Sequence, residues 1–146
     1  VKKIKIINRL VDPNVCKILY VLEPIRKDLK IKSSHIFEFH VLDFFIEKLQ
    51  KLNINKDIQI KLRLHPSENE SKYKSWIDSN KSSNLELTIN KSLEEDIAWS
   101  DIVVGYESFA LVVASHSGKR CISSKLPNEE NCRLMLENLE YLRDLY

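Results

Sequence analysis

The fold of this chain is decided at residues 101–118, which read DIVVGYESFALVVASHSG. The apolar run Ile102–Val104 ends at a glycine, which is typical of a buried strand that turns sharply at its end. The next run, 108–117, is apolar over most of its length and stops at Gly118, where a helix would place its left-handed C′ residue. The stretch therefore predicts a buried strand, a tight turn and a helix in succession.

The same alternation of strand and helix runs through the rest of the chain. Strands are predicted at 17–22, 57–64, 85–89, 101–105 and 120–123, and helices at 35–52, 67–80, 92–99, 108–117 and 131–145. This order predicts the α/β class, as a Rossmann-like, doubly wound, mostly parallel sheet of about five strands with helices on both faces. We expect a single domain spanning 1–146, in which residues 1–12 form either a strand or an extended arm.

Two local patterns refine these elements. Two serine–glutamate pairs have the spacing of a capping box, Ser67 with Glu70 and Ser92 with Glu95, which predicts helix starts at these places. Polar side chains alternate along the second predicted strand at Gln59, Lys61 and Arg63. This alternation predicts a position near the edge of the sheet, where long side chains reach solvent.

The composition is that of an ordinary soluble domain. Of the 146 residues, 43% are hydrophobic and 30% are charged, and the net charge is +2. These values exclude a disordered chain and a strongly basic nucleic-acid-binding domain. No apolar run approaches the roughly 20 residues of a membrane-spanning helix, and the lysines at positions 2, 3 and 5 interrupt any signal peptide there. We therefore expect a cytoplasmic protein without a nucleic-acid partner.

The cysteines and glycines indicate which kinds of binding site the chain can form. The cysteines at 16, 121 and 132 lack metal-type spacing, so they predict free thiols in a reducing compartment. With only Gly105 and Gly118, the chain has no glycine-rich phosphate loop. We expect neither a metal nor a cofactor. The chain begins with Val rather than Met, and we expect it to be part of a longer protein.

The second predicted strand ends in Arg63-Leu64-His65-Pro66. In an open α/β sheet, ligands bind beyond the carboxyl ends of the strands. Pro66 restricts His65 to an extended backbone, and an imidazole at that edge could donate a hydrogen bond to a phosphate. The alternative is a surface histidine that caps the following helix.

The fourth predicted strand is followed by Tyr106-Glu107-Ser108-Phe109. Ser108 is predicted to cap the next helix, and the amides of Phe109 and Ala110 to face a phosphate. Glu107 could accept hydrogen bonds from ribose or base hydroxyls, although an ordinary cap beside an exposed glutamate is the other interpretation. Substrate binding is predicted for six residues in all: His65, Glu107, Ser108, Phe109, Arg63 and Ser123.

The His-Pro strand end, residues 101–111 and the segment GKRCIS at 118–123 together resemble the C-terminal half of a GT-B glycosyltransferase. The similarity covers about 17–124 and is greatest to bacterial capsule and lipopolysaccharide enzymes of the polysialyltransferase-like kind. It implies a domain that binds a nucleotide-sugar donor, with His65 and Ser108 near the donor phosphates and Glu107 beside the nucleotide. The chain departs from the family pattern at 113–117 and at Lys119-Arg120, which bears on donor specificity more than on the fold.

The resemblance also implies partners. The donor would be a CMP- or UDP-linked sugar, and an N-terminal domain absent from this chain would hold the acceptor and the catalytic base. The chain alone would then be inactive, and the parent enzyme would associate peripherally with a membrane during surface polysaccharide synthesis. Two other hypotheses stay open: a stand-alone binding or regulatory domain for a phosphorylated ligand, and a structural partner domain with an empty crevice.

Overall fold

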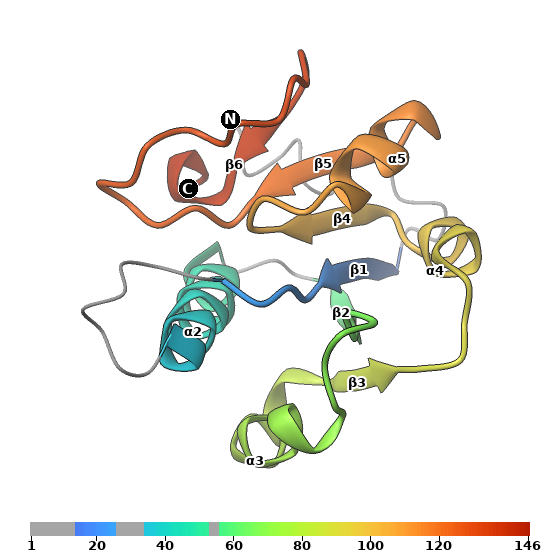
Figure 1. The fold of residues 1–146 in the computed structure, drawn as a ribbon, viewed down its shortest axis with the longest axis vertical. Helices are drawn as coiled ribbons and strands as arrows, with labels where there is room; N and C mark the ends of the chain where they lie inside the picture. The colour runs from blue at the N-terminus through green and yellow to red at the C-terminus, as the bar shows by residue number, and fades with distance from the viewer. Residues whose placement is uncertain (1–13, 26–33, 53–55) are drawn as a thin grey trace.

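Six strands form one sheet in which every neighbouring pair is parallel (Figure 1). The computed structural model describes residues 14–25, 34–52 and 56–146. In chain order the elements are β1 (Val15–Val21), α2 (Ser34–Leu52), β2 (Asp57–Arg63), α3 (Ser71–Ser79), the 3-10 helix η1 (Lys81–Ser83), β3 (Leu85–Thr88), α4 (Leu93–Trp99), β4 (Ile102–Gly105), α5 (Ala110–His116), β5 (Arg120–Ser123), β6 (Glu140–Tyr141) and the 3-10 helix η2 (Leu142–Asp144). The prediction for residues 1–12 lies outside the described residues.

The strand order is β3-β2-β1-β4-β5-β6, which is the order of a Rossmann sheet. The predicted α/β, doubly wound architecture is therefore confirmed, with one strand more than expected. After β1 the chain adds β2 and then β3 on one side, and it returns to add β4, β5 and β6 on the other. The topological switch point, where ligands bind in such sheets, thus lies between β1 and β4.

The central strand β1 is buried on both of its faces. Ile18 and Tyr20 pack in the core cluster that contains residues of α2 and α3. Leu19 and Val21 pack in a second cluster that contains residues of α4 and α5. Helices therefore cover both faces of the sheet, α2 and α3 on one and α4 and α5 on the other (Figure 1).

Gly105 ends β4 at a place where its neighbour comes unusually close. A Cβ atom built on Gly105 would lie 2.5 Å from Cγ2 of Val21 and 3.6 Å from Cγ of Leu111. Since Val21 pairs directly with Gly105 across the β1–β4 ladder, no side chain fits there without displacing the core. The glycine is required by packing, and it sits at the switch point.

Two helix ends follow the predicted local signals. Ser92 caps α4 by accepting a hydrogen bond from the Glu95 amide at 3.0 Å, and the Glu95 side chain completes the capping box. Gly118 follows α5 with φ of 79°. The amide of Lys119 donates to the carbonyl of Ala114 at 3.0 Å, as in a Schellman motif.

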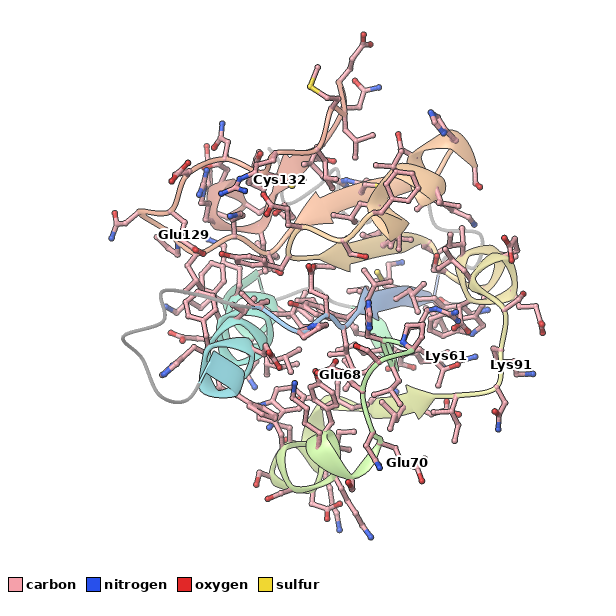
Figure 2. The ribbon with its side chains drawn as sticks, viewed as in Figure 1. Lys61, Glu68, Glu70, Lys91, Glu129 and Cys132 are labelled. Carbon is pink, nitrogen blue, oxygen red and sulfur yellow. The ribbon has the colours of Figure 1, made fainter. Side chains whose placement is uncertain are left out.

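The polar strand β2 is not at the edge of the sheet, because β3 pairs beyond it. Two of its polar side chains find partners on α4, while Gln59 is exposed. The Lys61 ammonium, labelled in Figure 2, lies 4.4 Å from the centre of the Trp99 ring. The Arg63 guanidinium donates to Asp96 at 2.8 Å. The predicted position near the edge is therefore confirmed, since β2 is the second strand from the end of the sheet, but Lys61 and Arg63 contact one short helix rather than only solvent.

Two helix predictions are corrected. The helix expected from residue 67 begins at Ser71, without a side-chain cap, because Ser67 bonds His65 instead. The final helix predicted at 131–145 is absent, and β6 and η2 stand in its place. There, Leu134 and Leu136 pack on the α5 side of the sheet, whereas Leu142 packs on the α2 side. One continuous helix could not reach both faces.

Within the described ranges, no helix is long and apolar enough to cross a membrane.

The contact between Gly105 and Val21 predicts a measurable packing cost. Gly105→Ala should lower the free energy of unfolding by about 1–3 kcal/mol, because the added methyl overlaps Val21. The same substitution made in a Val21→Ala background should cost clearly less, since the space is then open. Urea denaturation of the four proteins of this double-mutant cycle measures both effects, and equal costs in the two backgrounds would contradict the packing argument.

Candidate functional site

The predicted site residues follow strands whose carboxyl ends share one edge of the sheet. His65 lies just after β2, the turn of Glu107 and Ser108 follows β4, and Ser123 ends β5. Because β1 pairs in parallel with both β2 and β4, His65 and Ser108 lie at the same edge of the sheet, as the predicted parallel sheet requires. The strand β1 stands between them, so the two groups flank its end.

His65 is oriented by the turn that follows it. Its Nδ1 accepts a hydrogen bond from the Ser67 amide at 3.1 Å and lies 2.7 Å from the Ser67 hydroxyl. A neutral imidazole whose Nδ1 accepts a hydrogen bond carries its proton on Nε2. His65 therefore presents Nε2–H as the donor for any ligand at this edge.

The turn after β4 differs from the prediction. Phe109, not Ser108, is the N-cap of α5, and its side chain makes no capping bond. The Ser108 hydroxyl accepts a hydrogen bond from the Ala110 amide at 3.1 Å, so this amide does not face a ligand as expected. The Phe109 ring is 69% exposed. A ligand at this turn would therefore meet the Glu107 carboxylate and the exposed Phe109 ring, and not the Ala110 amide.

Arg63 and Ser123 have structural partners. Arg63 bridges the ends of β2 and β3 to α4, because its Nη1 donates to both the Lys91 carbonyl and the Asp96 carboxylate at 2.8 Å. The Asp96 side chain is only 2% exposed. Ser123 is fully buried and donates to the Tyr106 carbonyl at 2.7 Å. Both residues support the carboxyl edge from within the fold.

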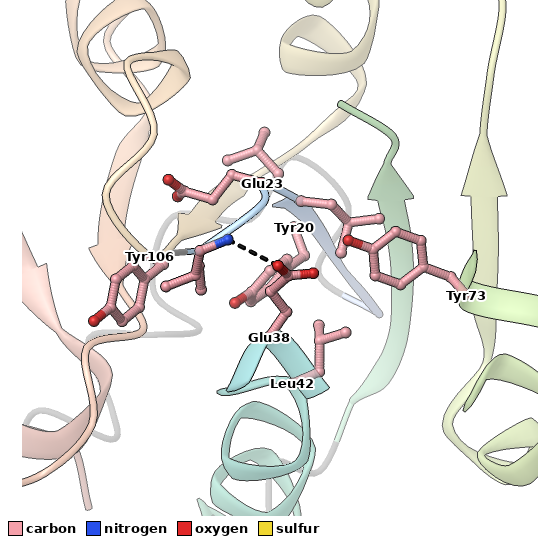
Figure 3. A pocket seen from close by; sticks show the side chains of 9 residues that line it. Tyr20, Glu23, Glu38, Leu42, Tyr73 and Tyr106 are labelled. Atoms are coloured by element: carbon pink, nitrogen blue, oxygen red, sulfur yellow. Dashed lines mark hydrogen bonds between the residues drawn. The ribbon is translucent and has the colours of Figure 1, made fainter. Parts of the chain in front are cut away.

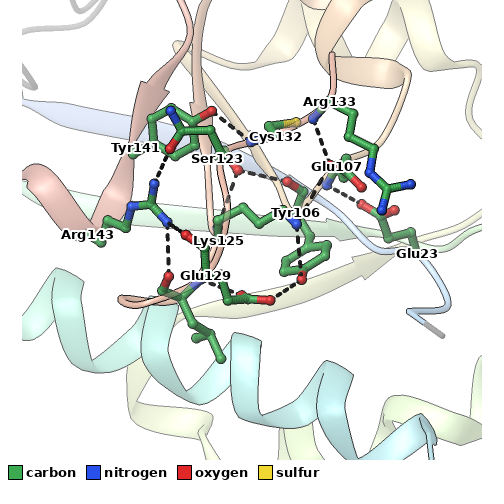
Figure 4. Close-up of polar contacts among 12 residues, drawn as sticks. Glu23, Tyr106, Glu107, Ser123, Lys125, Glu129, Cys132, Arg133, Tyr141 and Arg143 are labelled. Atoms are coloured by element: carbon green, nitrogen blue, oxygen red, sulfur yellow. Dashed lines mark hydrogen bonds and ion pairs between the residues drawn. The ribbon is translucent and has the colours of Figure 1, made fainter. Parts of the chain in front are cut away.

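A polar network joins the ends of β1, β4 and β5 at the switch point (Figure 4). The Glu107 amide donates to Glu23 Oε1 at 2.7 Å, and Glu107 Oε2 accepts from the Arg133 amide at 2.8 Å. The ammonium of Lys125 lies 3.7 Å from the same Oε2. Glu107, predicted as a site residue, is therefore the centre of the network.

The loop between β5 and β6 closes the network from the other side. Glu129, labelled in Figures 2 and 4, accepts hydrogen bonds from the Tyr106 hydroxyl and from the Leu126 amide. Arg143 holds the same loop by donating to the carbonyls of Leu126 and Glu129, at 3.1 and 2.8 Å. Burial, together with the Glu129 carboxylate, raises the pKa of the Tyr106 hydroxyl, which keeps it a donor.

Glu23 and Lys125 were missed by the sequence analysis. Each stands two residues beyond the end of a strand, Glu23 after β1 and Lys125 after β5. Their position relative to the strand ends was the available signal. The loop residues Glu129 and Arg133 carried no such signal, because neither follows a strand end directly and Arg133 fell within the helix expected at 131–145.

Burial raises the pKa of Glu23 from 4.5 to about 7. The hydrogen bond from the Glu107 amide and the charge of Lys125 act in the opposite direction, while the carboxylates of Glu107 and Glu38 raise the pKa further. Glu23 thus changes its charge near neutrality. The net charge of the switch point therefore depends on pH.

A cavity of about 10 Å³ lies beneath this edge, between β1 and α2 (Figure 3). Glu23, Glu38 and Tyr106 are among its lining residues. The buried Glu38 accepts a hydrogen bond from the Ile25 amide at 2.8 Å and pairs with Lys72. This volume admits about one water molecule. The cavity is therefore too small to hold a nucleotide.

Among the described residues, no group of three or more His, Cys, Asp or Glu side chains could hold a metal ion. Comparisons with protein family models, with curated proteins and with solved structures found no match for this chain.

Removing Arg63 should destabilise the fold. Arg63→Gln leaves the buried Asp96 carboxylate without its cation, which should lower the free energy of unfolding by about 2–4 kcal/mol. Lys61→Gln, on the same face of the same strand, is the matched control and should cost less than about 1 kcal/mol. Chemical denaturation compares the two variants, and equal stability of Arg63→Gln and the natural protein would contradict the structural role.

The raised pKa of Glu23 predicts how stability depends on pH. Between 4.5 and about 7 the carboxyl is protonated in the folded chain and ionised in the unfolded chain, so its contribution to stability is lost as the pH rises through this window. Glu23→Gln keeps an acceptor for the Glu107 amide but cannot ionise. The variant should therefore gain about 2 kcal/mol over the natural protein at about pH 8, and much less at about pH 4. Denaturation curves at the two pH values test this, and a pH-independent difference would refute it.

Proposed function

We propose that this domain binds a nucleotide sugar at its switch point and serves as the donor-binding half of a GT-B glycosyltransferase. The observation that carries the binding proposal is the strand order, since it places the switch point between β1 and β4. The polar groups of Glu23, Glu107 and Lys125 gather at that point, and His65 lies at the same edge.

Different groups of the site suit different parts of the proposed ligand. The Glu107 carboxylate is held by the Arg133 amide, and 23% of its side chain is exposed. It suits ribose or sugar hydroxyls, which donate hydrogen bonds. His65 stands beyond the end of β2 with Nε2–H as a donor, which suits a phosphate oxygen. The exposed ring of Phe109 could stack on a base.

The transferase part of the proposal is supported by the resemblance of 101–111 and 118–123 to that family. In such an enzyme the acceptor and the catalytic base would come from the second domain, across a cleft. The residues described above would then bind and orient the donor. The proposed role in surface polysaccharide synthesis and the preference for a CMP- or UDP-linked sugar rest on the same resemblance.

A second candidate is a stand-alone binding domain for a phosphorylated ligand. It is favoured by the closed network at the switch point, where the carboxylates of Glu107 and Glu129 accept hydrogen bonds from this chain's own groups. Both candidates predict that the isolated chain binds a phosphorylated ligand. The isolated chain should transfer no sugar in either case, so turnover above a heat-inactivated control would contradict both.

Calorimetric titration with CMP-, UDP-, GDP- and CDP-linked sugars tests the binding site. His65→Ala should weaken binding by about 10- to 100-fold, because a charge-assisted hydrogen bond to phosphate is lost. His116→Ala is the matched control, since this exposed histidine ends α5 and should leave the affinity unchanged. No binding of any of these compounds by the natural chain would overturn the proposed function. Unchanged affinity of His65→Ala would remove His65 from the site.

A further inference from the structure

Lys125 is a buried lysine whose ammonium has few hydrogen bonds. Only 7% of the residue is exposed, and it follows β5 at the carboxyl edge. Its Nζ lies 3.4 Å from the Tyr106 hydroxyl and 3.7 Å from Glu107 Oε2, and it stands 4.5 Å from the centre of the Tyr106 ring (Figure 4). An ammonium carries three N–H donors. Within the described part of the chain, these donors find one long hydrogen bond and one loose ion pair.

The neighbouring carboxylates are turned toward other donors. Glu107 Oε2 already accepts the Arg133 amide at 2.8 Å. Glu129 uses one oxygen for the Tyr106 hydroxyl and the other for the Leu126 amide. The carboxylates therefore balance the charge of Lys125 without satisfying its hydrogen bonds. Burying a cation is costly unless it is both paired and hydrogen-bonded.

The position of Lys125 indicates which kind of group could accept the remaining hydrogen bonds of its ammonium. It lies beyond β5, next to the turn of Glu107 and Ser108 that follows β4. An anionic oxygen bound over that turn would meet the ammonium and could accept from it. A lysine binds phosphate as a compact point charge, without the planar geometry that arginine requires.

We propose that Lys125 is the cation that contacts the phosphate of the ligand bound at the switch point. This inference rests on the proposed function and adds a residue to it. The ligand would lie across the ends of β1 and β4, with Lys125, beyond β5, on one side and His65, beyond β2, on the other. Glu107 is the more exposed partner of the ion pair, with 23% of its side chain exposed against 8% for Lys125, and it would share the cation with the ligand.

The experiment compares nucleotide sugars with nucleosides that lack phosphate. UDP-glucose and CMP-sialic acid are titrated into the natural chain and into Lys125→Gln and Lys125→Arg, with uridine and cytidine as the phosphate-free probes. Lys125→Gln should weaken binding of the nucleotide sugar by about 10- to 100-fold and leave nucleoside binding unchanged. Lys125→Arg should recover most of the affinity, because it restores the charge. Lys91→Gln is the control, an exposed lysine at the same edge after β3.

A second measurement does not depend on the variants folding. The NMR signal of the Lys125 side chain in the natural chain should shift when UDP-glucose or inorganic pyrophosphate is added, and it should not shift with uridine. An unmoved signal upon binding of UDP-glucose, or equal affinity of a folded Lys125→Gln, would overturn the role of Lys125 and leave the proposed function standing. Failure of the natural chain to bind either nucleotide sugar would overturn the proposed function and this inference with it.

Discussion

The close approach of β1 and β4 is the constraint on which the rest of the structure depends. Val21 lies against the backbone of Gly105, where a Cβ atom would be 2.5 Å away. β1 lies in the centre of the sheet and carries apolar side chains on both of its faces. Helices must therefore cover both faces. The same contact places the ends of β1 and β4 side by side. The packing that stabilises the core thus also creates the switch point.

Acidic side chains gather near a buried lysine at that edge of the sheet. Three carboxylates, those of Glu23, Glu107 and Glu129, lie near one buried ammonium, that of Lys125. Burial is the main cause of the raised pKa of Glu23, and the neighbouring carboxylate of Glu107 adds to it. An anionic ligand would add to this negative charge. The proton on Glu23 and the cation of Lys125 are therefore the two features through which the site could accept a phosphate.

The candidate site could be predicted from the sequence only in part. Residues at strand ends, such as His65 and Glu107, were found because parallel strands bring their carboxyl ends to one edge. Arg63 and Ser123 stand at strand ends too, yet each has a partner inside the fold, Asp96 for one and the Tyr106 carbonyl for the other. Distance along the chain does not reveal such partners, since 33 positions separate Arg63 from Asp96.

The sequence by itself determined the alternation of strands and helices, the buried central strands and the helix ends at Ser92 and Gly118. These features depend on residues within one or two turns of each other, so local propensity is enough to specify them. Only the tertiary structure decided the path of residues 131–145. Their leucines repeat in a way that suits a helix, but Leu134 packs on one face of the sheet and Leu142 on the other. The chain must pass the edge of the sheet to bury both, and burial against two opposite faces outweighs the local preference for a helix.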